Sequence, residues 1–267
     1  ASVTFSSLLD ASWENTRSSV IPIAGGGEAE VRDIFESEGG VAALEIGFAK
    51  RFGRIAAGAR VGRYTGSARR TLTRVYDSVT VGAPIAPFQT GGRWDYSGFT
   101  AIVGASASVG STVFLSGSLR VGGDLEATPS EDTRSPGGTL SLPPELRVGG
   151  SILLAPELVA TLGLSLADWS STDATGQTAW ELGGGVEWTG SRILGKNGAW
   201  RLGARRSALP FRPAGADSAV ETVFSGGLGL EVLQSESGVL GSIDLALEFG
   251  QRGLGSVTED MLRSTLT

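Results

Sequence analysis

Charged side chains able to bind or orient a ligand recur at alternate positions through much of this 267-residue chain. A guanidinium group can hold a carboxylate or phosphate head group through two parallel hydrogen bonds, so Arg201 and Arg205 are candidates for such a contact. The carboxylates outnumber the arginines, so the favoured interpretation is mutual ion pairing that holds neighbouring strands together. These residues are Arg60, Arg120, Arg147, Arg201 and Arg205, with Glu45, Glu181, Glu187, Glu221, Glu231, Asp244 and Glu248.

The composition excludes several kinds of chemistry. The chain has no His and no Cys, so it has no imidazole base, no thiol nucleophile and neither of the usual zinc ligands. Its formal net charge of -6 argues against a nucleic-acid surface, because phosphate binding needs clustered basic residues. We therefore expect no enzymatic activity, cofactor, metal or nucleic-acid partner.

Four aromatic and aliphatic residues are candidates for contacting an apolar ligand. Trp94 and Tyr96 lie near the end of an expected strand, where they would line the mouth of a barrel. Ile34 and Phe35 belong to the segment 28–38, in which the apolar residues have helical spacing. The sequence predicts a short helix over 28–38 in a long extracellular loop. That helix would offer an apolar landing surface or would simply pack on the barrel rim.

The elements that must position these residues are β-strands, because apolar and polar residues alternate through most of the chain. In the segment 158–166, for example, Leu158, Ala160 and Leu162 share one face, whereas Thr161 and Gly163 share the other. About twelve such segments can be counted, and the charged residues named above lie on the face opposite the apolar one.

Two environments produce this pattern. A soluble sandwich or barrel would bury the apolar face, and a transmembrane barrel would turn the apolar face toward lipid. The membrane environment is favoured because the segments run about 10–13 residues, which is close to a tilted bilayer span. Small residues on the polar face and aromatic residues near segment ends also favour it.

The connections between segments alternate between short turns and long loops, as in outer-membrane barrels. Short turns are expected near 52–53, 110–111, 155–156, 195–198 and 234–238, and Asn197-Gly198 predicts a tight hairpin turn. Long loops are expected over segments that include 16–39, 66–92 and 125–143.

Several stretches resemble the FadL-type outer-membrane transporters of hydrophobic compounds. They are GRWDYSGFTAIVGASASVG (92–110), SLRVGGDLEATP (118–129), LSLADWSST (164–172), WRLGARRSALPF (200–211) and SVTEDMLRSTLT (256–267). The resemblance implies a transmembrane antiparallel up-and-down β-barrel of fourteen strands, an N-terminal hatch and a side opening for apolar substrates. The hatch motif and an aromatic-ended final strand are not found here. We therefore expect residues 1–267 to form one barrel domain, incomplete at both ends, with about twelve of the fourteen strands.

The function expected from these features is passive diffusion of hydrophobic or amphipathic, fatty-acid-like molecules across the cell outer membrane. The expected partners are membrane lipid and a hydrophobic small molecule. The alternative is a structural or docking barrel whose long loops bind another envelope or surface protein. The candidate ligand-binding residues are Trp94, Tyr96, Arg120, Arg147, Arg201, Arg205, Ile34 and Phe35.

Overall fold

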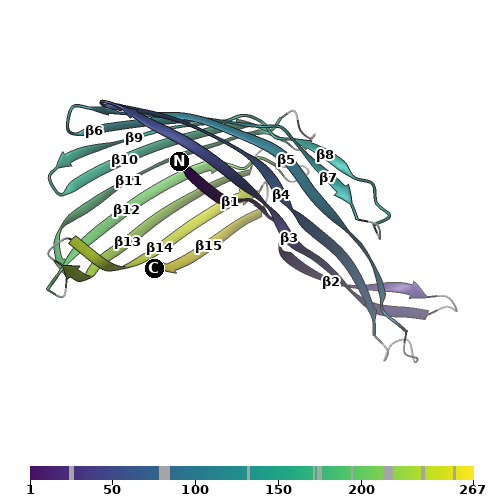
Figure 1. The fold of residues 1–267 in the computed structure, drawn as a ribbon. Helices are drawn as coiled ribbons and strands as arrows, with labels where there is room; N and C mark the ends of the chain where they lie inside the picture. Colours follow the sequence, from purple (N-terminus) through teal and green to yellow (C-terminus); the bar gives the residue numbers. More distant parts are fainter. Residues whose placement is uncertain are drawn as a thin grey trace. The chain divides into compact units, whose positions relative to one another are not determined.

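A computed structural model describes residues 1–23, 27–77, 85–130, 133–170, 172, 176–193, 195–212, 219–235, 238–254 and 257–267. Within these residues all of the regular structure is β-strand (Figure 1). No helix in the described ranges has the length and apolarity needed to cross a membrane.

The first eight strands are β1 (Ser2–Asp10), β2 (Trp13–Ile23), β3 (Gly27–Phe52), β4 (Ile55–Tyr76), β5 (Phe88–Val109), β6 (Val113–Gly122), β7 (Asp124–Pro129) and β8 (Gly138–Ser141). The remaining strands are β9 (Glu145–Ala155), β10 (Leu158–Asp168), β11 (Thr178–Ile193), β12 (Lys196–Ala208), β13 (Ala219–Ser235), β14 (Gly238–Leu254) and β15 (Val257–Leu266).

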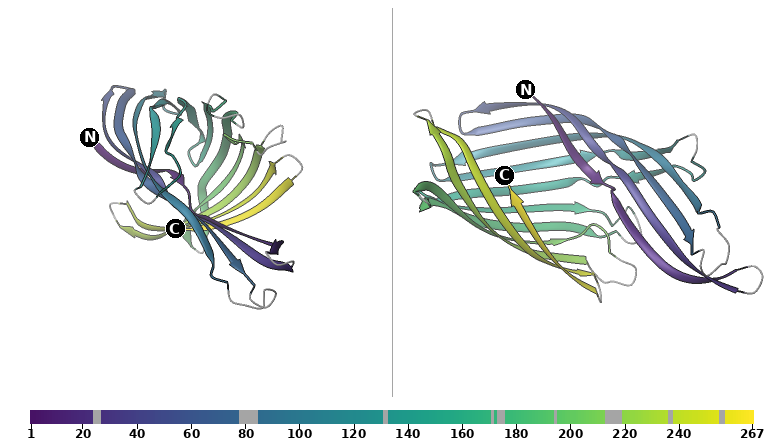
Figure 2. Two further views of the ribbon diagram at one scale, coloured as in Figure 1. Left: turned by 90° about the vertical axis from the view of Figure 1, so that its right-hand side faces the viewer. Right: turned by 90° about the horizontal axis from the view of Figure 1, so that it is seen from below.

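The strands are hydrogen-bonded in the order β1-β3-β4-β5-β6-β9-β10-β11-β12-β13-β14-β15, with β2, β7 and β8 outside this path. The path therefore holds the twelve strands expected from the alternation. It begins at β1 and ends at β15, so it is an open path in this chain. The consecutive pairs from β9 to β15 are antiparallel neighbours in sequence, as an up-and-down sheet requires (Figure 2).

Contacts between residues group the chain into two compact units. Unit 1 contains Ala1–Gly47, Arg60–Ala101 and Gly122–Leu142, and unit 2 contains Phe48–Ala59, Ile102–Val121 and Pro143–Thr267. Each unit is described by itself below.

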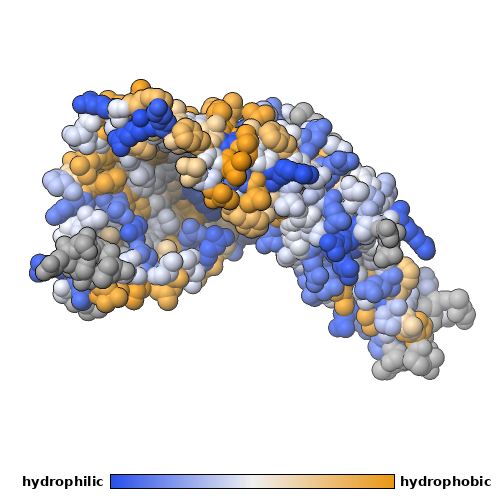
Figure 3. Space-filling view, viewed as in Figure 1, coloured by the Kyte–Doolittle hydropathy of each residue, from blue (hydrophilic) through white to orange (hydrophobic). Residues whose placement is uncertain are grey.

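The apolar stripes of unit 2 are exposed. Val103 is 53% exposed, Leu162 63% and Ile243 46%. In Figure 3 many apolar residues (orange) lie on the molecular surface. The polar stripe of the same strands carries ion pairs and glycines, as described below. This arrangement is the reverse of a soluble sandwich, in which the apolar stripe is covered, and it matches strands whose apolar face meets lipid.

Unit 1 has a small apolar core on the face opposite its exposed stripe. Val41, Ala43, Tyr64 and Leu125 are each at most 3% exposed and form one cluster. Leu44 and Ile46, which alternate with the core positions of β3, are exposed. The two faces of β3 therefore differ in burial residue by residue, as the period of two demands.

An ion pair between a buried acid and a partly exposed arginine lies on the same inner face of unit 1. Glu45 is 1% exposed, and one of its carboxylate oxygens lies 3.3 Å from the guanidinium of Arg60. Each side chain lies over a glycine of the neighbouring strand. A Cβ added to Gly62 would stand 2.8 Å from Glu45 Cγ, and one added to Gly47 would stand 2.4 Å from Arg60 Cγ. The glycines therefore make the room that lets two long side chains lie flat against the strands.

The predicted helix over 28–38 is wrong. These residues lie inside β3 and pair with β2, from Ile23↔Gly27 to Trp13↔Ser37. Ala29 and Val31 are buried on one face, and Ile34 and Phe35 pair with Thr16 and Asn15. The long loops predicted over 16–39 and 66–92 are also largely strand, because β2, β3, β4 and β5 extend into them. Cross-strand hydrogen bonding overrides the weak helical spacing of a few apolar residues.

The short connection expected near 195–198 is confirmed at Gly195, whereas the tight turn predicted at Asn197-Gly198 is displaced by two residues. Asn197 and Gly198 lie inside β12, paired with Arg192 and Ser191. The chain instead turns next to Gly195, which has a φ of 76°. The short turns at 52–53 and 110–111 are confirmed, with Gly53 at a φ of 63° and Gly110 at 67°. Positive φ is the conformation in which glycine costs least.

Candidate functional site

Unit 2 contains a cavity of about 690 Å³ whose lining comes from strands β9 to β14. Its charged residues are Glu145, Arg147, Glu181, Arg205 and Glu248. The rest of the lining is uncharged and consists of Val148, Gly163, Leu164, Ser165, Gly183, Gly184, Gly203, Ala204, Val223 and Ser225. The site is therefore a hollow of mixed character, in which bare backbone, hydroxyl groups and apolar carbon lie beside a few charges.

The strand register explains why the hollow forms there. Gly163 on β10 pairs directly with Gly149 on β9 and with Gly183 on β11. Three adjacent strands therefore present no side chain at this level. A Cβ added to Gly163 would meet its nearest neighbour, the Val148 carbonyl oxygen, at 3.9 Å. The space above this glycine is open, so the backbone itself forms part of the lining.

Arg205 on β12 lies at the end of this row of glycines, because it pairs directly with Gly183 on β11. Its two terminal nitrogens contact different carboxylates, with Glu221 at 2.9 Å and Glu181 at 3.5 Å. Glu221 is only 5% exposed. Arg205 is therefore held by one acid on each neighbouring strand, and its charge is compensated within the protein.

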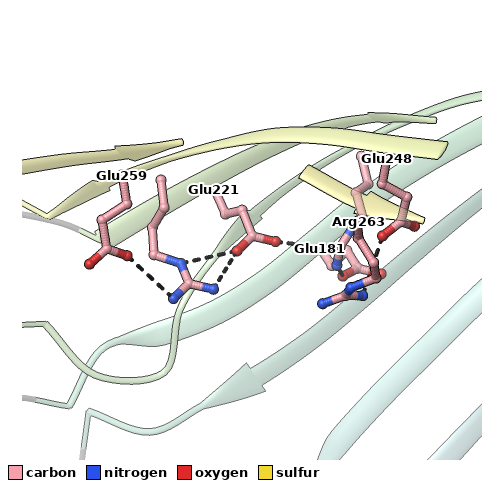
Figure 4. Close-up of polar contacts among 7 residues, drawn as sticks. Glu181, Glu221, Glu248, Glu259 and Arg263 are labelled. Atoms are coloured by element: carbon pink, nitrogen blue, oxygen red, sulfur yellow. Dashed lines mark hydrogen bonds and ion pairs between the residues drawn. The ribbon is translucent and has the colours of Figure 1, made fainter. Parts of the chain in front are cut away.

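The same contacts continue as a ladder of alternating charge across β11 to β15. Glu221 accepts hydrogen bonds from Arg252 Nε at 3.0 Å and Nη2 at 2.7 Å. Arg252 lies 3.8 Å from Glu259 on β15. Figure 4 shows Glu259, Glu221 and Glu181 following one another along this ladder. Ion pairs between directly opposed residues stabilise an antiparallel sheet and fix its register.

A second ion-paired group lies on β6 and β9. Arg147 donates from Nε to Glu145 at 2.7 Å, and its Nη2 lies 2.6 Å from the same carboxylate. The guanidinium of Arg120, which pairs with Glu145 across the two strands, lies 3.8 Å from that carboxylate. Glu145 therefore contacts both Arg120 and Arg147 at this end of the cavity.

The structure brings together two of the four arginines proposed as ligand contacts. Arg147 and Arg205 line the cavity, and Arg120 contacts it through Glu145. Arg201 lies outside the lining, where it contacts Glu187 at 2.5 Å and also contacts Asp244. The pairing of arginines with acids that the sequence favours is confirmed at each of these four residues.

The other four candidates belong to unit 1. Trp94 donates from Nε1 to the Pro136 carbonyl oxygen at 3.2 Å and pairs with Pro129 on β7. Tyr96 packs against the core of Val41, Ala43, Tyr64 and Leu125. Ile34 and Phe35 lie on β3, and Phe35 is 37% exposed. Tyr96 therefore has a packing role that its position in the sequence does not reveal.

Sequence reasoning named three polar lining residues neither as ligand contacts nor as ion-pair partners: Glu145, Ser165 and Ser225. Ser165 and Ser225 lie on the polar face of clear strands, so the alternation could have nominated them. Glu145 is the first residue of β9, directly after a proline pair, where the alternation has only just begun.

A second hollow, of about 530 Å³, lies on the apolar stripe of β6, β9, β10 and β11. Leu115 on β6 and Leu162 on β10 both pair with Gly150 on β9, so the glycine forms a dent between two leucines. This hollow belongs to the exposed apolar face, and its lining holds no charged residue. A hydrocarbon chain is the kind of molecule that such a surface attracts.

Comparison with solved structures identifies a Pseudomonas aeruginosa FadL homologue with a similar fold. The match has a TM-score of 0.54 and 12% sequence identity, and it covers 94% of this chain and 75% of the homologue. No family model matches the chain, and a search of curated proteins finds no match. The antiparallel all-β fold implied by the sequence resemblance is confirmed: this chain has a fold similar to that of the FadL homologue, with its strands in an open path.

Proposed function

We propose that this protein forms an outer-membrane channel that passes hydrophobic or amphipathic small molecules by passive diffusion. The observation that carries the proposal is the division of each strand of unit 2 into two faces. Leu162 is 63% exposed on the apolar stripe, whereas the adjacent Gly163 lines a cavity of about 690 Å³. An exposed apolar stripe is stable in contact with lipid, and a polar inner face with a hollow can hold a solute.

The driving force of such a channel is the transfer of apolar surface out of water, which needs no cofactor and no energy source. Membrane lipid is then the partner of the outer stripe, and the solute is the partner of the cavity. The FadL-type fold supports this proposal at the level of architecture. The ionised groups of the inner face have partners, so they can stay charged without stopping an uncharged solute.

Uptake by cells tests the proposal. Cells producing the full-length protein should take up a radiolabelled aromatic hydrocarbon faster than cells with an empty vector. Gly163→Trp fills the cavity from its open lining position and should reduce uptake to the empty-vector rate. Ala246→Trp is the matched control, because Ala246 lies on the same inner face, opposite Gly227 and outside the cavity lining.

Equal uptake by cells with and without the protein would contradict the proposal, provided that immunoblotting finds the protein in the outer membrane. Retained uptake in Gly163→Trp would show that the transported molecule does not pass through this cavity. Surface levels of both variants must match the parent protein for the comparison to hold.

A further inference from the structure

We infer that the cavity of unit 2 selects uncharged ligands over carboxylates; this inference rests on the proposed function and specifies its substrate class. The charged lining consists of two arginines, Arg147 and Arg205, and three glutamates, Glu145, Glu181 and Glu248. These five residues carry a formal net charge of -1. The lining therefore has no excess of positive charge and gives an anion no unpaired cation to contact.

Both lining arginines are already bound to carboxylates. Arg147 has two close contacts with Glu145, at 2.6 and 2.7 Å. Arg205 lies between Glu221 at 2.9 Å and Glu181 at 3.5 Å. A ligand carboxylate at either guanidinium would have to share a cation whose charge a glutamate already compensates, so the contact would bring it little gain.

The third acid is also paired within the protein. Glu248 on β14 lies opposite Arg263 on β15, and the two groups are 3.3 Å apart. Figure 4 shows Glu248 and Arg263 facing one another. Since Arg263 is not part of the cavity lining, it does not offer a ligand carboxylate a further site there.

The uncharged part of the lining fits a neutral amphipathic molecule. Gly163 and Gly183 expose backbone, Ser165 and Ser225 carry hydroxyl groups, and Val223 supplies apolar surface. Hydroxyl groups can donate to and accept from an alcohol or a carbonyl without any change of charge. The ligand class that follows is an apolar ring or chain with at most a hydroxyl or carbonyl group.

A matched pair of probes tests this selectivity. Benzyl alcohol and benzoate share a ring and differ in charge at neutral pH. Binding of each radiolabelled probe to the full-length protein in non-ionic detergent is measured by equilibrium dialysis, with protein-free micelles as the blank. One lost or gained charged contact corresponds to about tenfold in affinity. The alcohol should bind at least about tenfold more tightly than benzoate on the same scale.

Glu145→Gln releases the guanidinium of Arg147 and should raise the benzoate-to-alcohol affinity ratio by about tenfold. Glu157→Gln removes the same charge at the β9–β10 turn, outside the lining, and should leave the ratio unchanged. Glu157→Gln and Glu145→Gln each remove one negative charge, so a difference between them reports on the cavity and not on net charge.

Benzoate binding as tight as alcohol binding in the parent protein would overturn the inference while leaving transport intact. An equal rise of the ratio in both variants would also overturn it, because the effect would then be one of net charge and not of the cavity. No binding of either probe, combined with no cellular uptake, would overturn the proposed function as well.

Discussion

Arg201 and Asp244 form an ion pair although a complete strand lies between them. Arg201 is on β12 and Asp244 on β14, and the intervening β13 has glycine at both nearby inner positions, Gly227 opposite Arg201 and Gly229 opposite Asp244. A Cβ added to Gly229 would stand 2.7 Å from Asp244 Oδ1 and 3.0 Å from Arg201 Nη1. The absence of a side chain on β13 thus allows the guanidinium to cross that strand.

The first prediction concerns this crossing. A double-mutant cycle with Arg201→Gln and Asp244→Asn should give a coupling free energy of about 0.5–1 kcal/mol, typical of a partly exposed ion pair. In a Gly229→Ala background the coupling should fall close to zero, because the methyl group occupies the space of the contact. Urea unfolding of protein folded in lipid vesicles supplies the four free energies of each cycle.

Gly226→Ala is the matched background. It lies on the same strand but on the apolar stripe, where an added Cβ meets its nearest side chain, Leu202, at 3.8 Å. Coupling that persists with Gly229→Ala, or vanishes equally with Gly226→Ala, would refute the role of Gly229. Comparing coupling energies also removes the general gain of about 0.5–1 kcal/mol that alanine has over glycine in a strand.

The second prediction compares two consecutive residues on opposite faces of β10. Leu162→Arg places a charge on the apolar stripe and should destabilise the membrane-inserted state by about 2–4 kcal/mol. Thr161→Arg places the same charge on the inner face and should cost much less, since that face already holds ion pairs. The measurement is the unfolding free energy in lipid vesicles of defined composition, with both variants prepared in parallel.

Similar costs for the two variants would contradict the assignment of the faces. A larger cost at Thr161 than at Leu162 would mean that the apolar stripe does not contact hydrocarbon. Thr161→Gln and Leu162→Gln, which have similar size and no charge, separate the effect of charge from that of volume.

The third prediction concerns pH and the part of β3 that was expected to be a helix. Arg74 donates two hydrogen bonds to Asp33, at 2.6 and 2.7 Å. These bonds hold the pKa of the Asp33 carboxyl below its ordinary value. A carboxyl whose pKa is lowered by folding stabilises the folded state above its unfolded pKa of about 3.9, and that contribution is lost as pH falls through the lowered value.

Carboxyl NMR of selectively labelled protein should therefore give a titration midpoint for Asp33 below that of an unstructured aspartate. Arg74→Gln should raise this midpoint toward the ordinary value. The difference in melting temperature between the parent protein and Arg74→Gln should be largest near neutral pH and should vanish below the Asp33 midpoint. A difference that stays constant from neutral to strongly acidic pH would show that Arg74 acts through packing alone.

The alternation of residue types was enough to predict the twelve strands of the main path and their two faces, but not β2 or the extensions of β3, β4 and β5. In β10, Leu162 and Thr161 could be assigned to opposite faces because successive side chains of a strand must point in opposite directions. The final strand, β15, follows from the same pattern. The class of fold could be predicted for the same reason, since long two-faced strands that expose their apolar side have few stable arrangements outside a membrane.

The error at 28–38 has a definite physical origin. Val31, Ile34 and Phe35 fit a helical period, but Ala29, Val31 and Asp33 fit a strand period equally well. The decision rests on partners outside the segment: β2 supplies the hydrogen bonds, and Arg74 on β4 supplies the charge for Asp33. A window of eleven residues contains none of these partners, so its local pattern could not decide the matter.

The sequence by itself determined which residues share a face, because the period of two belongs to the single strand and needs no partner. Only the tertiary structure decided which residues meet across strands, since a register depends on turns, bulges and the neighbouring chain. The row Gly149, Gly163 and Gly183 lines up solely through that register, and Gly163 and Gly183 of this row line the cavity. The same register gives Arg205 its carboxylate partners on β11 and β13, whereas Arg147 finds Glu145 on its own strand.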